Sequence, residues 1–100
     1  MYICDMDNVI IDLYGKSNHQ IAESLGKRYR EYRVALGLTR KEISETCGVS
    51  AMTLARFENG NASAISLGNL IALLRAIQKL DSIEAMLPHI PESLYKRSKR

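Results

Sequence analysis

The chain has 100 residues, the length of one small domain, because chains usually divide into several domains only beyond roughly 250 residues. Hydrophobic residues make up 46% and charged residues 25%, a balance typical of globular proteins and unlike that of disordered chains. The formal net charge of +3 allows an anionic partner without requiring one.

The sequence also argues against a membrane or secreted protein. No apolar run approaches the roughly 20 residues that span a bilayer. The run over residues 8–13 is interrupted by Asp12 and follows no basic stretch, so it is unlike a secretory signal. The two cysteines, Cys4 and Cys47, make neither a disulfide framework nor a zinc site. We therefore expect a cytoplasmic, single-domain protein with no cofactor, no metal and no membrane partner.

The spacing of apolar residues becomes helical from Ile21 onward. Gly37 should end this first helix, because glycine tolerates the left-handed backbone of a helix exit. Residues 1–18 contain an apolar patch and a break at Gly15, which favours an arm or a short strand. The residues expected to form the buried stripe of the first helix are Ile21, Leu25, Tyr29, Tyr32 and Leu36.

Two short helices with their own start signals should follow. Thr39 and Glu42 form a T-x-x-E capping box for a helix over residues 40–47. Ser50 should cap a second helix, over residues 51–58. Such a pair is too small to bury both apolar faces alone. The residues that these two helices should bury are Ile43, Cys47, Leu54 and Phe57.

Two further helices should cover that pair. Ser66 can cap the first of them, and Asp81 with Glu84 offers a capping box for the second, which Pro88 should end. Five helices and no convincing strand predict an all-α domain. The apolar residues at helical spacing in these two segments are Leu67, Leu70, Ile71, Leu74 and Ile77, then Ile83, Met86 and Leu87.

Some apolar and basic residues exceed what one small core needs. We predict that Leu73, Leu80 and Met86 form a homodimer surface on the C-terminal helices, because contiguous exposed apolar area usually marks an interface. The last nine residues hold four basic residues against Glu92. Such a basic end is either a solvated tail or an electrostatic arm for nucleic acid.

Residues 39–60 resemble the helix-turn-helix of the phage repressor and Cro type, the XRE family, with the motif itself over residues 40–59. The likeness extends back to Leu25–Arg33, which resembles the first helix of the family, and forward to about Leu87. The positions that the motif keeps apolar are Ile43, Cys47, Val49, Leu54 and Phe57, and Gly48 stands at its turn.

The resemblance implies a particular domain organisation. It predicts a five-helix, lambda-repressor-like DNA-binding domain over residues 19–88. A flexible N-terminal arm over residues 1–18 and a basic tail over residues 89–100 should flank this domain. The resemblance also pairs Arg33 with Glu58 as a buried structural ion bridge between the first helix and the end of the second motif helix.

In this family the second motif helix lies in the major groove, where every base pair shows a distinct donor and acceptor pattern. The resemblance places Ala51, Met52 and Arg56 at base-contacting positions. Arg56 is the best candidate for specific readout, since a guanidinium can bond guanine with two hydrogen bonds. Ala51 and Met52 offer only apolar contact, which departs from the polar side chains of lambdoid repressors.

Phosphate contacts should fix the register of the protein on DNA. The helix starts at Thr39 and Ser50 present amide groups that suit an oxyanion, and Arg40 can add a positive charge. The full set of expected phosphate contacts is Thr39, Arg40, Lys41, Ser50, Thr53, Asn59 and Asn61.

An enzyme is not expected. His19 and His89 lie far apart, and the sequence contains no paired carboxylates, no nucleophile elbow and no phosphate-binding glycine loop. Cys47 lies on an apolar face, which favours a buried thiol over a reactive one.

The sequence therefore predicts a transcription regulator that binds double-stranded DNA, as a dimeric repressor. An alternative is an antitoxin of a toxin-antitoxin pair, because residues 66–88 and the basic end resemble small regulators paired with HipA-like toxin kinases. A third hypothesis is a helix-turn-helix scaffold that has lost DNA binding, whose binding would respond little to salt.

Overall fold

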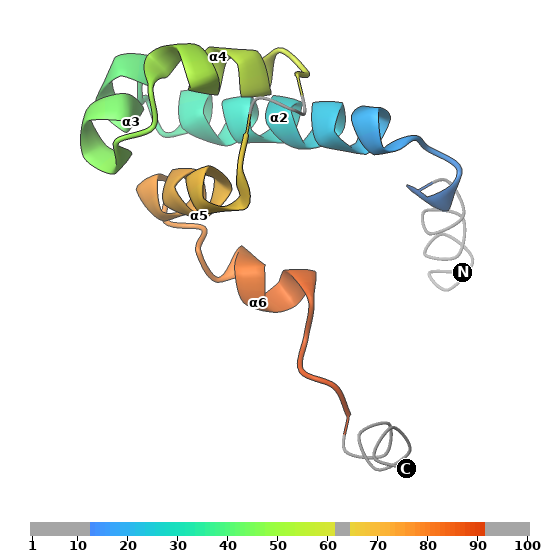
Figure 1. Ribbon diagram of the computed structural model, residues 1–100. Helices are drawn as coiled ribbons and strands as arrows, with labels where there is room; N and C mark the ends of the chain where they lie inside the picture. Colours follow the sequence, from blue (N-terminus) through green and yellow to red (C-terminus); the bar gives the residue numbers. More distant parts are fainter. Residues whose placement is uncertain (1–12, 62–64, 92–100) are drawn as a thin grey trace.

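The computed structural model describes residues 13–61 and 65–91, and within these residues the secondary structure consists of α-helices and turns. Over these described residues the fold is all-α, with the five helices that the sequence predicts. Most of the predicted arm and tail, residues 1–12 and 92–100, lies outside the described residues. The helices, labelled as in Figure 1, are α2 (Asn18–Ala35), α3 (Arg40–Cys47), α4 (Ala51–Glu58), α5 (Leu67–Ala76) and α6 (Ser82–Met86).

Local capping interactions set most of the helix starts. The Thr39 hydroxyl accepts a hydrogen bond from the Glu42 amide at 3.1 Å, and the Glu42 carboxylate accepts one from the Thr39 amide at 2.9 Å. Ser50 and Ser66 cap α4 and α5 through single hydroxyl contacts. At the start of α2, Ser17 forms a second capping box with Gln20, which was not predicted from the sequence.

The predicted capping box at Asp81 is wrong. Asp81 already has helical backbone angles, φ −60° and ψ −21°, and its side chain makes no capping hydrogen bond. An N-cap residue normally has an extended backbone, which aims its side chain at the first-turn amides. Instead, the Ser82 and Ile83 amides donate to the Lys79 and Leu80 carbonyls, so the chain enters α6 through successive turns.

Two predicted glycine exits have left-handed backbone angles. Gly37, just beyond the end of α2, has φ +74°, and Gly48, between α3 and α4, has φ +81°. These angles suit glycine because a side chain there would meet its own backbone. The tight turn at Gly48 allows α4 to pack directly against α3.

The core lies where α2, α3, α4 and α5 meet. α4 packs on both α2 and α3, and α3 also packs on α5, as Figure 1 shows. α2 and α5 thereby cover the apolar faces that the α3–α4 pair cannot bury alone. The buried hydrophobic residues are Tyr29, Ile43, Val49, Leu54, Phe57, Leu73 and Ile77, with Cys47 packed partly buried beside them.

The predicted buried stripe of the first helix is correct only at Tyr29. The other four residues of that stripe, Ile21, Leu25, Tyr32 and Leu36, are between 37% and 54% exposed. The buried edge of α2 runs instead through Gly26, Tyr29 and Arg33. Two of these are not apolar, so hydrophobic spacing alone could not identify them.

Gly26 explains why α2 turns this edge inward. A Cβ atom at position 26 would lie 3.0 Å from the Phe57 carbonyl carbon and would overlap its oxygen. The backbones of α2 and α4 are therefore in direct contact at this point. Only glycine permits an approach this close, because it has no side chain.

The assignment of Leu73 to a homodimer surface is also wrong. Leu73 has an exposed fraction of 0% and packs in the core of the monomer. Its carbonyl accepts a hydrogen bond from the Tyr29 hydroxyl at 2.8 Å, which fastens α5 to α2. Because α5 turns this residue inward, Leu73 is unavailable to a partner.

We predict that Gly26→Ala destabilises the fold, because the added methyl group forces α2 and α4 apart. Overpacking of this kind typically costs about 1–3 kcal/mol of unfolding free energy. Gly68→Ala is the matched control, since a Cβ there meets nothing within 4 Å and alanine favours a helix. Denaturant unfolding of both variants checks this. Equal stabilities would show that the α2–α4 contact is not tight.

We also predict a loss of stability at alkaline pH that depends on Tyr29. Burial, with the nearby Glu58 and Cys47 as smaller causes, raises the pKa of the Tyr29 phenol in the folded state. Above the ordinary tyrosine pKa of about 10, the unfolded chain loses this proton while the folded chain keeps it. Unfolding free energy should therefore fall by about 1.4 kcal/mol per pH unit there.

The control for this effect is Tyr29→Phe. It should be less stable at neutral pH by about 1 kcal/mol, because the hydrogen bond to Leu73 is lost. It should also lack the alkaline slope that wild type shows in urea unfolding. The same slope in both proteins would assign the alkaline effect to another group.

Candidate nucleic-acid interface

α4 has two faces with opposite roles. Leu54, Phe57 and Glu58 point into the protein and are buried. Met52 is 64% exposed, and Arg56, one turn further along the helix, is exposed as well. Figure 1 shows α4 along the outer side of the bundle, with α5 and α6 on the far side of α2. The helix therefore presents its outer face to solvent.

The three residues expected to contact bases lie together on this outer face. Ala51 and Met52 form the first turn of α4, and Arg56 follows within the next turn. All three are exposed. The end of α4 that family members insert into the groove is therefore accessible.

A buried ionic cluster holds α4 in this orientation. The Glu58 carboxylate, whose side chain is 0% exposed, accepts hydrogen bonds from Arg33 Nε at 2.8 Å and Arg33 Nη2 at 3.0 Å. This is the ion bridge that the resemblance implied. Arg33 Nη1 also donates to the Leu38 carbonyl at 2.9 Å. The hydrogen bond to Glu58 raises the pKa of Arg33 further, so the guanidinium stays charged.

Arg40 is the third member of this cluster. Its Nε donates to Glu58 Oε1 at 3.0 Å, and its side chain is 36% exposed. From the sequence Arg40 was expected to contact phosphate only, so this internal role is a new finding. One carboxylate thus joins α2, α3 and α4. The sequence feature that could have indicated this role is an arginine at the first position of α3, because its long side chain reaches Glu58 at the end of α4.

The starts of α3 and α4 differ in their suitability for an oxyanion. At α3 the capping box already occupies the Thr39 and Glu42 amides and places the Glu42 carboxylate there. The hydrogen bond from the Thr39 amide, with a smaller contribution from the Thr39 side chain, lowers the pKa of the Glu42 carboxyl group, which is therefore anionic at neutral pH. The first turn of α4 contains no acidic residue. The start of α4 therefore has no carboxylate that would repel an oxyanion.

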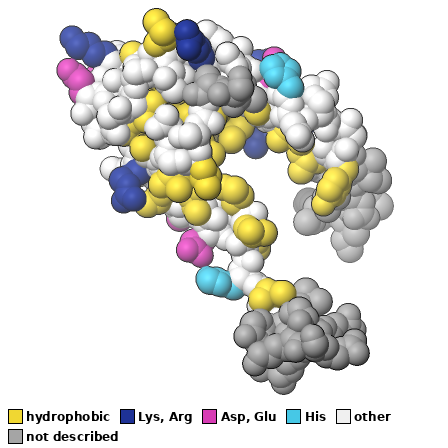
Figure 2. All heavy atoms as spheres, viewed as in Figure 1, with side chains coloured by type: hydrophobic (Ala, Val, Ile, Leu, Met, Phe, Trp, Pro, Cys, Tyr) yellow, Lys and Arg dark blue, Asp and Glu magenta, His cyan; other side chains and the backbone are white. Residues whose placement is uncertain are grey.

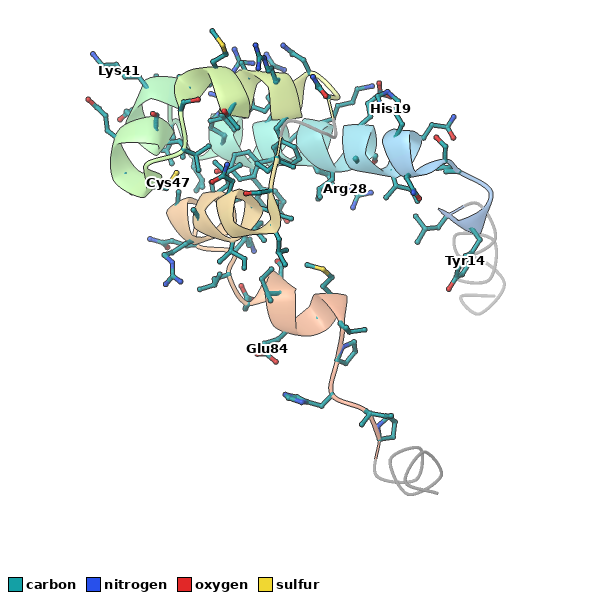
Figure 3. The ribbon with its side chains drawn as sticks, in the orientation of Figure 1. Tyr14, His19, Arg28, Lys41, Cys47 and Glu84 are labelled. Atoms are coloured by element: carbon teal, nitrogen blue, oxygen red, sulfur yellow. The ribbon has the colours of Figure 1, made fainter. Side chains whose placement is uncertain are left out.

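The remaining candidate phosphate residues surround these two helix starts. Lys41 is exposed in the first turn of α3 and extends away from the bundle (Figure 3). The Ser50 hydroxyl donates to the Thr53 hydroxyl at 2.9 Å, which fixes both side chains at the start of α4. Asn59 and Asn61 are exposed just beyond α4. Figure 2 shows lysine and arginine side chains projecting over the α3–α4 end of the molecule.

Other kinds of site find little support in the described part of the chain. Its histidine, cysteine and acidic side chains nowhere form a cluster of three able to hold a metal ion. Cys47 is half-buried against the core. None of the described helices is both long and apolar enough to cross a bilayer.

Comparison with known proteins identifies the family. The family model described as "Helix-turn-helix" matches residues 30–81, more than half of the chain. The chain therefore belongs to the helix-turn-helix family of the XRE type. The match contains α3 and α4, which carry the candidate contact residues, together with α5 and the C-terminal part of α2.

One curated relative is an enzyme. It is glutamine–fructose-6-phosphate aminotransferase (isomerizing) of Methanocaldococcus jannaschii, 33% identical over 60 residues. The alignment covers 59% of this chain and 6% of that protein. The likeness is therefore to a small part of the relative, and its enzymatic name is no guide to this chain. No solved structure matches this chain.

We predict that Glu58→Gln destabilises the fold far more than Arg40→Gln. Loss of the carboxylate leaves the buried Arg33 guanidinium without its counter-charge, which typically costs about 3–5 kcal/mol. Arg40 is partly solvated, so its removal should cost about 1 kcal/mol or less. Thermal unfolding at neutral pH compares the two. Equal losses would contradict the view that Glu58 and Arg33 form the essential pair.

Proposed function

We propose that this protein is a transcription regulator that binds double-stranded DNA sequence-specifically by laying α4 in the major groove. The observation that carries the proposal is the exposed outer face of α4, held rigidly by the buried Glu58 cluster. Membership of the helix-turn-helix family supports the same function.

Three side chains carry the sequence preference in this proposal. Arg56 bonds the edge of a guanine, for which the expected discrimination is about 1–3 kcal/mol. Met52 and Ala51 supply apolar contact, for example to a thymine methyl group. Apolar side chains tolerate several neighbouring bases better than paired hydrogen bonds do, so we expect specificity to concentrate at the base that Arg56 contacts.

Phosphate binding supplies the larger, sequence-independent part of the affinity. The start of α4, with Ser50 and Thr53, accepts one phosphate, because no carboxylate competes there. Lys41 reaches a second phosphate from α3. Arg40 contributes through the guanidinium nitrogens that do not bond Glu58, while Thr39, Asn59 and Asn61 contribute neutral contacts.

The proposed regulator acts as a dimeric repressor. With Leu73 in the core, the proposed dimer surface rests on the half-buried Leu80 and the exposed Met86. Leu80 lines a shallow hollow of about 440 Å³ together with Ile71 and Ile83, which a second copy can fill. Two-fold symmetry then makes the operator a palindrome with half-sites about 34 Å apart. Sedimentation that shows only monomer would contradict the proposed dimer.

The antitoxin alternative stays a prediction. It requires binding of a HipA-like kinase in addition to DNA. Copurification of such a kinase with the native protein would favour it over the simple repressor.

The test of the proposed function begins with selection of bound duplexes from a random DNA pool. On the selected duplex, Arg56→Ala should lose about 1–3 kcal/mol of binding free energy and relax the sequence preference at one base position. Lys41→Ala should weaken binding to all duplexes alike. It should also reduce the salt dependence of the affinity by the amount expected for about one phosphate contact. Arg75→Ala, an exposed arginine on α5, is the matched control and should bind as wild type.

Two results would contradict the proposal. One is a selected pool with no sequence preference and binding that hardly responds to salt. The other is an Arg56→Ala protein with unchanged affinity and preference while Arg75→Ala is impaired. That second outcome would move the interface from α4 to the opposite side of the bundle.

A further inference from the structure

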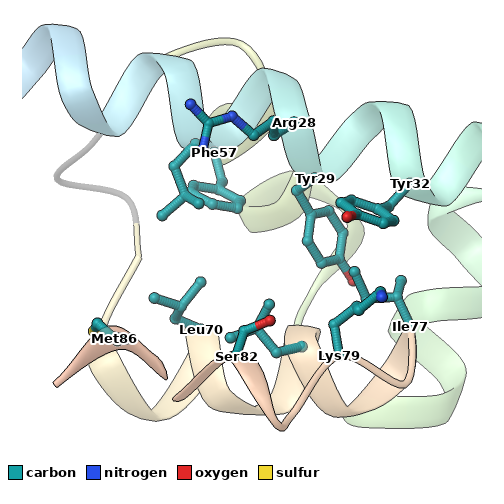
Figure 4. A pocket seen from close by; sticks show the side chains of 11 residues that line it. Arg28, Tyr29, Tyr32, Phe57, Leu70, Ile77, Lys79, Ser82 and Met86 are labelled. Atoms are coloured by element: carbon teal, nitrogen blue, oxygen red, sulfur yellow. The ribbon is translucent and has the colours of Figure 1, made fainter. Parts of the chain in front are cut away.

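An open apolar groove lies on the side of the bundle away from the outer face of α4. It has a volume of about 380 Å³, and its lining includes Leu25 and Tyr32 of α2, Leu70 and Leu74 of α5, and Met86 of α6 (Figure 4). Figure 2 shows hydrophobic side chains gathered around the hollow between α2 and the C-terminal helices. Exposed apolar area of this kind usually has an occupant.

The rim of this groove is basic. Arg28 of α2 and Lys79, which follows α5, both line it. The Lys79 ammonium lies 5.3 Å from the centre of the Tyr32 ring, so its charge stands at the groove wall. The groove therefore favours an occupant that is apolar on one side and acidic at its flanks.

The groove continues toward the N-terminal end of the described chain. A smaller hollow of about 150 Å³ shares Leu25 and Arg28 with the groove and is also lined by Leu13 and Ile21. The Lys16 amide donates to the Leu13 carbonyl in a turn just before α2. Leu13, to which residues 1–12 are joined, therefore lies next to the groove.

The sequence of residues 1–12 has the matching character. It contains three aspartates, Asp5, Asp7 and Asp12, and no lysine or arginine. Its apolar residues recur every three or four positions, the spacing that lies along one side of a helix. That stripe consists of Tyr2, Ile3, Met6, Val9 and Ile10 and continues into Leu13.

We propose that residues 1–12 fill this groove within the same molecule, as an amphipathic helix that runs back along α2. A helix of this length spans about 18 Å, whereas the two turns of α2 from Leu25 to Tyr32 span about 10 Å. The segment therefore reaches the whole groove. Its apolar stripe covers Leu25, Tyr32 and Leu74, and Asp5 and Asp7 flank the stripe near Arg28 and Lys79.

This docking is independent of DNA binding. The groove lies across α2 from the outer face of α4, so the docked segment leaves Met52 and Arg56 accessible. It also covers Met86 of α6, so while the segment is docked the proposed dimer contact rests on Leu80, which lies outside the groove.

The experiment places a nitroxide spin label on Cys4 of the full chain. Cys47→Ala first makes Cys4 the only thiol, and Cys4 lies outside the apolar stripe, so a label there does not block docking. The NMR amide signals of Tyr32, Leu74 and Lys79 should lose intensity, while those of Met52 and Arg56 should not. The loss should persist on dilution, because docking is intramolecular.

Two neighbouring isoleucines provide a matched pair of variants. Ile10→Asp places a charge in the apolar stripe and should restore the groove signals. Ile11→Asp makes the same chemical change on the other side of the helix and should leave the signal loss intact. A chain with both Asp5→Lys and Asp7→Lys should reduce the loss by removing charge pairing, and it leaves the apolar stripe unchanged.

Several outcomes would overturn this proposal. No signal loss at the groove would mean that the segment does not dock there. Equal behaviour of Ile10→Asp and Ile11→Asp would exclude a helical stripe. A second experiment mixes spin-labelled protein that is not isotope-enriched with enriched protein that carries no spin label. Loss of the Tyr32, Leu74 and Lys79 signals in this mixture would show that a second molecule supplies the occupant.

Discussion

The buried carboxylate of Glu58 is the interaction on which the rest of this structure depends. It stands at the end of α4 without contact to solvent, and burial of such a charge is costly unless it is fully paired. Arg33 supplies that pairing from α2 and Arg40 supplies it from α3. Since the geometry of paired charges is directional, the cluster fixes how three helices meet, which apolar packing alone would do less strictly.

The orientation of α4 follows from this constraint. Leu54 and Phe57 pack into the core beside Glu58, so the residues on the other side of a two-turn helix must face outward. Gly26 contributes from the opposite partner, because it lets the backbone of α2 touch that of α4. A surface helix this short has little stability of its own, and tertiary contacts hold it in place. The proposed function therefore rests on the same residues as the fold.

The features of the fold that could be predicted from the sequence are those set by interactions between residues close together in the chain. The Thr39–Glu42 capping box and the Ser50 cap act over three residues, so the bounds of α3 and α4 agreed with the structure. The apolar stripe predicted for α2 was correct only at Tyr29, because the buried edge also depends on Gly26 and Arg33, whose partners lie 25 or more residues away. The family resemblance predicted the burial of Arg33 against Glu58, but no pattern predicted the backbone contact at Gly26. For the candidate site, the exposure of Met52 agreed with expectation. The engagement of Arg40 by Glu58 did not follow from any local pattern.

The most direct test of the central claim is an NMR titration of the wild-type chain with a selected DNA duplex. If the Glu58 cluster presents α4 to the major groove, the amide signals that shift most should be those of Ser50, Met52 and Arg56 and of the first turn of α3. The signals of Tyr32 and Leu74, across the bundle, should stay in place. Shifts centred on α5 and α6, with α4 unchanged, would contradict the account.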